Sequence, residues 1–288
     1  MLSSIDKNLG GLLCGTWVNS YFFLIELIMC YKYFTRYHRE DPFWLKMTVL
    51  ITLLVDVVST IDHYAMIYMY TNTHWGDEEF LKRQYWPMPV YLVTTGASAW
   101  IVQHFLIFRF WLLSRNKFVT PFLSLASMVA FAGAIVTGVV IAKFPSYDKR
   151  TKADAPVTVW LTASAVSDVL IAVVLIYTLQ RMKTSLRRTQ TLVKHLTILA
   201  IQTGSPGSVG ATIGLIVYLN DNENNISVGI AFSLGRIYAL TMLHNLNSRE
   251  QIRAASNITG FSTLMQLNLA GTLPLNATSN DPNEIQGA

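Results

Sequence analysis

Seven apolar runs of membrane-spanning length cover most of this 288-residue chain. A helix needs roughly 20 apolar residues to cross a bilayer, because each residue adds only about 1.5 Å of rise. Helices also bond their backbone amides internally, as a bilayer requires. We therefore predict an all-α protein, a polytopic bundle of seven transmembrane helices. The predicted spans are residues 9–31, 45–68, 89–111, 118–142, 157–179, 192–219 and 226–246.

The composition fits a lipid environment, since 52% of the residues are hydrophobic and only 14% are charged. A typical soluble domain has roughly 25% charged residues. The spans and their short connections use the chain to about residue 248, so a second folded domain is not expected. We predict a membrane domain over residues 1–248 and a polar, disordered cytosolic tail over residues 249–288, where Asn, Ser and Thr are frequent.

Positive charge alternates from loop to loop and predicts the orientation. The loops that follow the first, third, fifth and seventh spans carry twice as many Lys and Arg residues as the opposite side. Cytoplasmic loops are enriched in these residues, which predicts an extracellular amino terminus and a cytosolic carboxyl terminus. The net charge of +5 then reflects contact with lipid headgroups, without any nucleic acid partner. We expect the lipid bilayer of the plasma membrane or an endomembrane as the main partner, and a cytosolic partner at the basic loops.

Small residues recur at every fourth position of the fourth predicted span. Such a stripe lets a neighbouring helix approach closely. Packing inside one bundle and a homodimer interface both explain it, and we favour packing inside the bundle. The stripe consists of Ala126, Ala130, Ala134, Gly138 and Ala142.

Three ionisable residues lie near the middle of their spans, at about the same predicted depth. They are Asp56 in the second span, Asp168 in the fifth and Arg236 in the seventh. Charged groups at this depth are costly and face the bundle interior. We predict that Arg236 is the counter-charge for Asp56, Asp168 or both, either in a ligand site or in an ion pair that orients helices. One acid is left over, and it must bind a proton, a cation or a cationic ligand.

Other polar residues are scattered over the spans as secondary candidates. A zinc site needs three or four converging ligands, whereas these residues occur singly, so we predict no metal site, no cofactor and no catalytic residue. We expect helix–helix hydrogen bonds instead. We also expect His104 and His244 to lie near each other at the cytosolic face. The candidates are Glu26, Asp62, His63, Gln103, His104 and His244.

Short motifs follow one another in a fixed order along the spans. They are Asp41-Pro42-Phe43-Trp44-Leu45-Lys46, Thr95-Gly96, Val102-Gln103-His104-Phe105, Arg109-Phe110-Trp111-Leu112-Leu113-Ser114, Trp160-Leu161, Asp168-Val169-Leu170-Ile171-Ala172, Thr184-Ser185-Leu186-Arg187-Arg188-Thr189 and Leu246-Asn247-Ser248-Arg249. Together, over residues 9–249, they resemble a large family of seven-helix membrane proteins of basidiomycete fungi whose function is unknown. The resemblance implies the fold and no particular activity.

Two departures from that family stand out. Such proteins read like Asn-Thr-Gly-Leu-Leu-Thr-Ser in the sixth helix, whereas this chain has Gln202-Thr203-Gly204-Ser205-Pro206-Gly207-Ser208. Proline at that position removes a backbone hydrogen bond, so we predict a kink. The usual histidine soon after the second-helix aspartate is also missing here.

Two familiar seven-helix classes are excluded. The seventh span has no lysine to bind retinal, and residues 108–111 and 236–240 lack the Asp/Glu-Arg-Tyr and Asn-Pro-x-x-Tyr motifs of rhodopsin-like receptors. We predict receptor-like sensing of a small or lipidic ligand. An ion-coupled transporter that uses the midplane charges is the alternative, and an intramembrane hydrolase is the third possibility.

Overall fold

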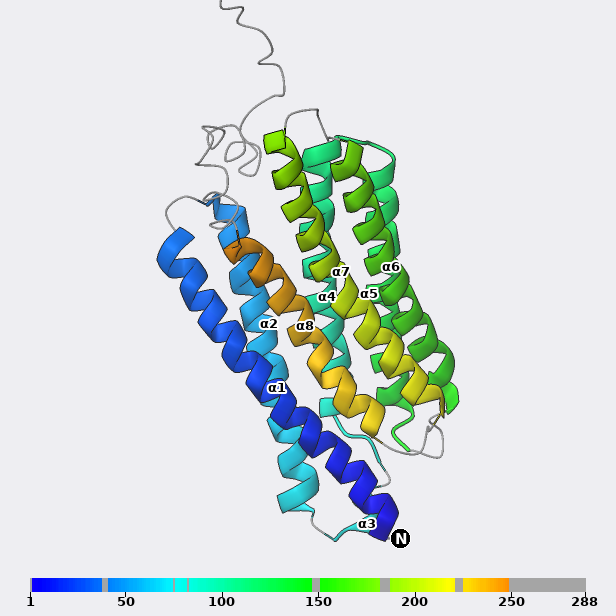
Figure 1. Ribbon diagram of the computed structural model, residues 1–288. Helices are drawn as coiled ribbons and strands as arrows, with labels where there is room; N and C mark the ends of the chain where they lie inside the picture. The colour runs from blue at the N-terminus through cyan, green and yellow to red at the C-terminus, as the bar shows by residue number, and fades with distance from the viewer. Residues whose placement is uncertain are drawn as a thin grey trace, which may run out of the picture.

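The computed structural model describes residues 2–37, 41–74, 76–81, 83–146, 151–181, 187–220 and 225–248. These residues are helical almost throughout, and the β-structure among them is one isolated bridge between Arg83 and Ser146. The long helices lie side by side in one bundle (Figure 1). The predicted all-α fold is confirmed over this part of the chain. The predicted tail over residues 249–288 lies outside the described residues.

Every predicted span coincides with a long helix. The π-helical turn η1 (Met69–Thr73) extends the second of these helices, and the short helix α3 (Glu78–Leu81) follows in the connection. The long helices are α1 (Leu2–Tyr37), α2 (Phe43–Tyr68), α4 (Pro87–Ser114), α5 (Val119–Lys143), α6 (Asp154–Arg181), α7 (Arg187–Asn220) and α8 (Ile226–Asn247). The amino-terminal ends of α1 and α8 both lie near the lower end of the bundle in Figure 1.

Local sequence explains where α4 begins and ends. Pro87 occupies its first turn, where the missing N–H has no partner to lose. At the other end Arg115 takes a left-handed conformation with φ of 51°, and its N–H bonds to the carbonyl of Trp111. This closure of the last turn stops the helix and lets the chain turn back into α5.

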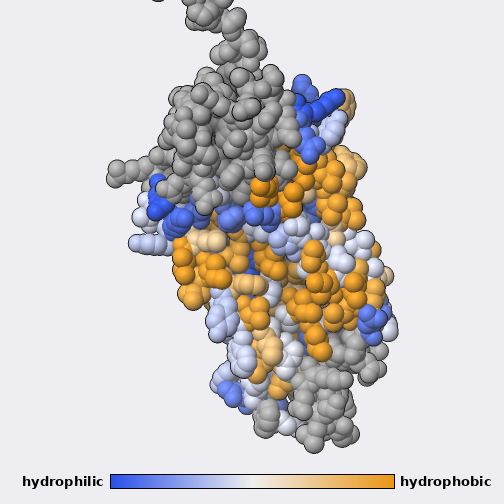
Figure 2. All heavy atoms as spheres, viewed as in Figure 1, coloured by the Kyte–Doolittle hydropathy of each residue, from blue (hydrophilic) through white to orange (hydrophobic). Residues whose placement is uncertain are grey.

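Six helices in the described part are long and apolar enough to cross a membrane. They are α1, α2 with η1, α4, α5, α6 and α8. Helix α7 is not among them, because Gln202–Ser208 interrupts its apolar sequence. Large hydrophobic side chains, such as Leu54 and Leu125, point outward from the bundle. Figure 2 shows hydrophobic residues gathered over the middle of the visible face. An apolar outer surface of this kind indicates an integral membrane protein.

Helix α8 lies inside the bundle. Its contact with α1 is the most extensive between any two helices in the described part of the chain. Glycines permit this approach: a Cβ on Gly15 of α1 would lie 2.5 Å from Gly229 of α8, and a Cβ on Gly229 would lie 2.2 Å from the carbonyl oxygen of Gly11. Any side chain at these positions would force the two backbones apart.

The small-residue stripe of α5 packs against α4. Ala130 and Ala134 are buried, and a Cβ added to Gly96 of α4 would lie 2.6 Å from that of Ala134. Gly138 lies against Pro89 in the same way. The middle of the stripe therefore serves packing inside one bundle, while the homodimer remains a prediction.

Candidate functional site: two buried polar networks

Arg236 on α8 and Asp56 on α2 form an ion pair inside the bundle. Nη1 of Arg236 lies 2.5 Å from Oδ1 of Asp56, and both side chains are 1% exposed. Nη2 donates to the backbone carbonyl of Asp56 at 2.6 Å and to the hydroxyl of Thr60 at 2.7 Å. Ser98 of α4 donates to Asp56 Oδ1 at 2.7 Å, and the ring of Phe23 on α1 lies 5.3 Å from the guanidinium. Four helices therefore meet at this ion pair.

Polar side chains next to the ion pair lack hydrogen-bond partners among the described residues. Glu26 of α1 is fully buried and interacts electrostatically with both members of the pair. Asn19 lies about two turns before Glu26 on the same face of α1 and is also fully buried. Neither ring nitrogen of His63 on α2 has a partner. Buried polar groups are nearly always satisfied, so these indicate bound water, a proton or an ion.

Asp168 on α6 belongs to a second buried network. Gln103 of α4 donates to its Oδ1 at 2.7 Å, and the hydroxyl of Tyr238 on α8 donates to its Oδ2 at 2.6 Å. Ser127 of α5 donates to Gln103 Oε1 at 2.7 Å, and Ser164 bonds to the Tyr238 hydroxyl at 3.1 Å. All of these partners are neutral. They stabilise a carboxylate by hydrogen bonding and leave its charge uncompensated.

The interrupted sequence of α7 fits this second network. A Cβ on Gly207 would lie 2.7 Å from Oδ2 of Asp168 and 2.6 Å from the ring of Tyr238. A Cβ on Gly204 would lie 2.7 Å from that of Ala172. The two glycines that flank Pro206 therefore let α7 cover the carboxylate closely. The predicted kink at Pro206 remains a prediction.

The two networks lie on different sides of α8. Arg236 and Tyr238 are two residues apart, which rotates their side chains by about 200° around a helix. The sequence left open whether Arg236 pairs with Asp56, with Asp168 or with both. The structure joins it to Asp56 and places Asp168 with Gln103 and Tyr238. The three midplane charges therefore do not form one cluster.

The secondary candidates separate in the same way. Gln103 joins the Asp168 network, and His104 bonds to Ser124 of α5 at 3.0 Å. His244 is exposed near the end of α8. Asp62 is 2% exposed and has no hydrogen-bond partner there. Over the same residues, no three His, Cys, Asp or Glu side chains converge as a metal site.

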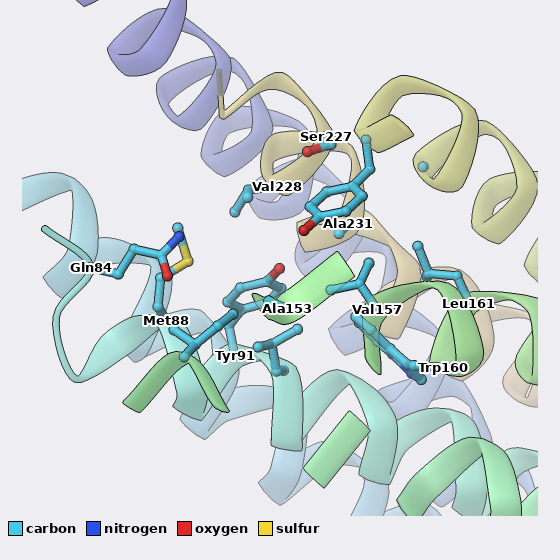
Figure 3. A pocket seen from close by; sticks show the side chains of 14 residues that line it. Gln84, Met88, Tyr91, Ala153, Val157, Trp160, Leu161, Ser227, Val228 and Ala231 are labelled. Carbon is cyan, nitrogen blue, oxygen red and sulfur yellow. The ribbon is translucent and has the colours of Figure 1, made fainter. Parts of the chain in front are cut away.

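A narrow cavity lies between α4, α6, α7 and α8, near the amino-terminal end of α8 (Figure 3). Its volume is about 40 Å³, which is room for a few water molecules. The walls are mostly apolar, and Ser227 contributes a buried hydroxyl without a partner among the described residues. Tyr218 spans one side and donates to Asp154 at 2.8 Å. The lining residues are Gln84, Met88, Tyr91, Leu92, Ile141, Ala153, Val157, Trp160, Leu161, Gly214, Tyr218, Ser227, Val228 and Ala231.

Aromatic side chains and one helical turn connect this cavity to both networks. The ring of Tyr91 in the cavity wall meets Phe232 at 5.3 Å, and Phe232 stacks on His63 at 3.9 Å. On α6, Trp160 in the wall lies one turn before Ser164, which bonds to Tyr238. A ligand that moves either wall residue would therefore disturb a buried polar network.

Some of these residues escaped the sequence analysis because they are ordinary helix residues. Ser98, Thr60 and Tyr238 are uncharged, and hydroxyl residues are common in membrane helices. Thr60 carries a usable signal, since it follows Asp56 by four residues and so shares its face. For Ser98, the sequence has no comparable signal, because its partner is 42 residues away.

A bundle of apolar helices around buried polar networks defines the class: this is an integral membrane protein of the helical-bundle type. A profile of a family of unknown function (DUF6534) matches residues 164–251. The matched segment includes Asp168, Arg236 and Tyr238. Comparison with curated proteins and with solved structures found no match.

Proposed function

We propose that this protein is a receptor-like membrane protein that senses a small or lipidic ligand in the cavity of Figure 3. The observation that supports this most directly is the position of the cavity. Tyr91 of its wall packs on Phe232, which stacks on His63, and Trp160 of its wall lies one helical turn before Ser164 of the Asp168 network. Mostly apolar walls with a few polar groups are typical of sites for small apolar molecules. The cavity is narrow, so we expect Tyr91 or Tyr218 to move when the ligand binds.

The proposal includes the membrane arrangement. All seven long helices span the bilayer, so α7 is added to the six apolar helices named above. The amino terminus is extracellular and the carboxyl terminus is cytosolic. The basic residues at the cytosolic ends and the acids in the opposite loops support this orientation. The cavity then opens toward the outer side. The resemblance to fungal seven-helix proteins over residues 9–249 is part of the same proposal.

The coupling surface lies at the opposite end of the bundle. There Arg109 of α4 hydrogen-bonds to Asn245 of α8, and Asn247 donates to the carbonyl of Met29 on α1 at 3.0 Å. These bonds join two helices to the end of α8. A shift of α8 caused by ligand binding would change the spacing of the cytosolic ends, where the basic loops are expected to bind a cytosolic partner.

One observation favours the ion-coupled transporter as a second candidate. Glu26 and Asp56 both carry carboxylate oxygens that are buried and unpartnered among the described residues. Such groups are typical of ion pathways in membrane proteins. The intramembrane hydrolase remains a third, untested hypothesis.

The receptor proposal is tested by filling the cavity. Gly214 lines it, and a Cβ at this position meets nothing within 4 Å, so Gly214→Leu occupies the cavity without a clash at its root. Gly10→Leu is the matched control, because Gly10 has equally free space and lies outside the cavity. Both proteins are reconstituted in nanodiscs with photoactivatable sterol and fatty-acid probes.

In the wild type we expect the probe to label peptides of the cavity wall around Trp160 and Tyr218. In Gly214→Leu we expect only weak labelling of these peptides. The Gly10→Leu protein should label as the wild type does. Probe addition should also change hydrogen exchange at the cytosolic helix ends. Equal labelling of all three proteins, or labelling confined to lipid-facing positions, would overturn the proposal. Probe-dependent counterflow in proteoliposomes would favour the transporter.

A further inference from the structure

Glu26 is the acid in the bundle whose surroundings are least explained by the proposed receptor function. Its side chain is 0% exposed and lies near the ion pair of Asp56 and Arg236. No N–H or hydroxyl donor among the described residues reaches either carboxylate oxygen of Glu26 or Oδ2 of Asp56. The two carboxyl groups lie within hydrogen-bonding contact of each other, an arrangement that needs a positive charge between them. Unsatisfied buried acceptors of this kind require a bound species to satisfy them.

The charges around Glu26 do not balance. Helix α1 contributes the carboxylate of Glu26 and the thiol of Cys30, which is neutral when protonated. From α2 come the carboxylate of Asp56 and the imidazole of His63, and from α8 comes Arg236. The contact from α4 is the uncharged hydroxyl of Ser98.

His63 does not correct this imbalance. It stacks on Phe232 and lies near the positive charge of Arg236, which disfavours a second cation. Two carboxylates and one guanidinium therefore leave one negative charge in a site closed to water. That excess is matched by a single positive charge.

The number of ligands distinguishes a monovalent cation from a divalent one. Calcium takes six to eight oxygens, roughly, and magnesium requires a near-octahedral set. No three acidic, His or Cys side chains converge here within the described part of the chain. The acceptors without a donor are the two oxygens of Glu26 and Oδ2 of Asp56. Arg236 is bound to Asp56 and Thr60 and does not occupy these oxygens.

We propose that Glu26 and Asp56 form a binding site for one exchangeable monovalent cation, a sodium ion or a proton, beside Arg236. The bound charge completes the contact of α1 with α2 and α8, because Glu26 belongs to α1 while its charged neighbours belong to the other two helices. Cation binding thereby stabilises the position of α1 in the bundle.

The test measures thermal unfolding of the full-length protein in detergent. The apparent Tm is recorded from 1 to 500 mM NaCl, with choline chloride keeping the ionic strength constant, and separately from pH 5.5 to pH 9. The variant is Glu26→Gln, which removes the charge and keeps the shape. Glu79→Gln is the matched control, because Glu79 is exposed at 86% and its ion pair with Arg83 at 3.8 Å is a surface contact.

If sodium is the ligand, the Tm of the wild type rises by about 3–6 °C per tenfold increase in sodium above the Kd. If the proton is the ligand, sodium has no effect and the Tm falls as the pH rises, because the folded state then binds a proton that the unfolded chain does not. Either dependence should persist in Glu79→Gln. In Glu26→Gln the sodium dependence should disappear, and the pH dependence should become shallower, because the buried acids Asp62 and Asp168 remain. Identical sodium and pH dependence in wild type and Glu26→Gln would overturn the proposal.

Infrared difference spectra of the wild type provide a readout that needs no variant. Sodium binding should shift a carboxylate stretching band, whereas proton binding should produce a carbonyl band of a protonated carboxyl group that shifts in D2O. Spectra that change with neither sodium nor pH would also overturn the proposal.

Discussion

The pairing of Arg236 with Asp56 predicts a specific pattern of mutational coupling. Arg236→Leu removes the 2.5 Å ion pair and the hydrogen bonds to Thr60 and to the backbone carbonyl of Asp56. It leaves Asp56 as a buried carboxylate that still accepts a hydrogen bond from Ser98. Breaking a buried ion pair on one side costs about 3–5 kcal/mol, because the other charge stays uncompensated.

Removing both charges should cost much less than the sum of the single changes. Asp56→Asn together with Arg236→Leu leaves no buried charge in the pair, so we expect a coupling energy of about 2–4 kcal/mol. Asp168→Asn is the control acid, because Asp168 bonds to Gln103 and Tyr238 whereas Arg236 bonds to Asp56 and Thr60. Its effect should add to that of Arg236→Leu within about 0.5 kcal/mol.

The chain offers a direct assay for this cycle. Cys30 is buried at 4% exposure, so a thiol-reactive fluorescent dye reports its release as the protein unfolds. Cys14 is exposed, and all variants therefore carry Cys14→Ser to remove the background. The single changes should lower the apparent Tm by roughly 6–20 °C. Coupling of Arg236→Leu to Asp168→Asn, with additivity toward Asp56→Asn, would refute the assignment of the pair.

Two further changes test the rest of the framework in the same assay. Tyr238→Phe deletes a 2.6 Å donor to Asp168 and should cost about 1–2 kcal/mol, more than Ser164→Ala, which removes only a bond to the tyrosine hydroxyl; equal costs would contradict this ranking. Gly229→Ala places a methyl group 2.2 Å from a backbone oxygen of α1 and should cost about 3 kcal/mol or more, whereas Gly10→Ala has free space and should be neutral; an unaffected Tm in Gly229→Ala would contradict the close contact of the two backbones.

The positions of the long helices could be predicted from the sequence, although α1 extends from Leu2 to Tyr37 and so exceeds the predicted span 9–31 at both ends. A span of apolar residues constrains its own length, and that constraint is local in the chain. The apolar pattern is weakest in α7, where polar residues and Gly and Pro around Pro206 lower the hydropathy. The structure explains that stretch as a contact surface, since Gly204 and Gly207 fit against α6 and α8.

The partners of the buried charges could be predicted only in part. Depth along a span can be counted, so Asp56 and Arg236 were recognised as being at one level. Rotation about the helix axis relative to distant helices cannot be counted in the same way, because packing determines it. For that reason the sequence did not exclude Asp168 as a partner, and it gave no reason to associate Glu26 with the pair. The uncharged donors around Asp168 carry no charge signal at all.

The ion pair also has a consequence for biosynthesis. Asp56 reaches the membrane early, and Arg236 follows 180 residues later in the last helix. During that interval the nascent chain contains Glu26 and Asp56 in its first two helices without their guanidinium partner. Chains that stop before α8 keep this exposed acidic pair in the bilayer, and they also lack the glycine surface that α1 packs against. Completion of α8 therefore supplies both the counter-charge of Asp56 and the glycine surface on which α1 packs.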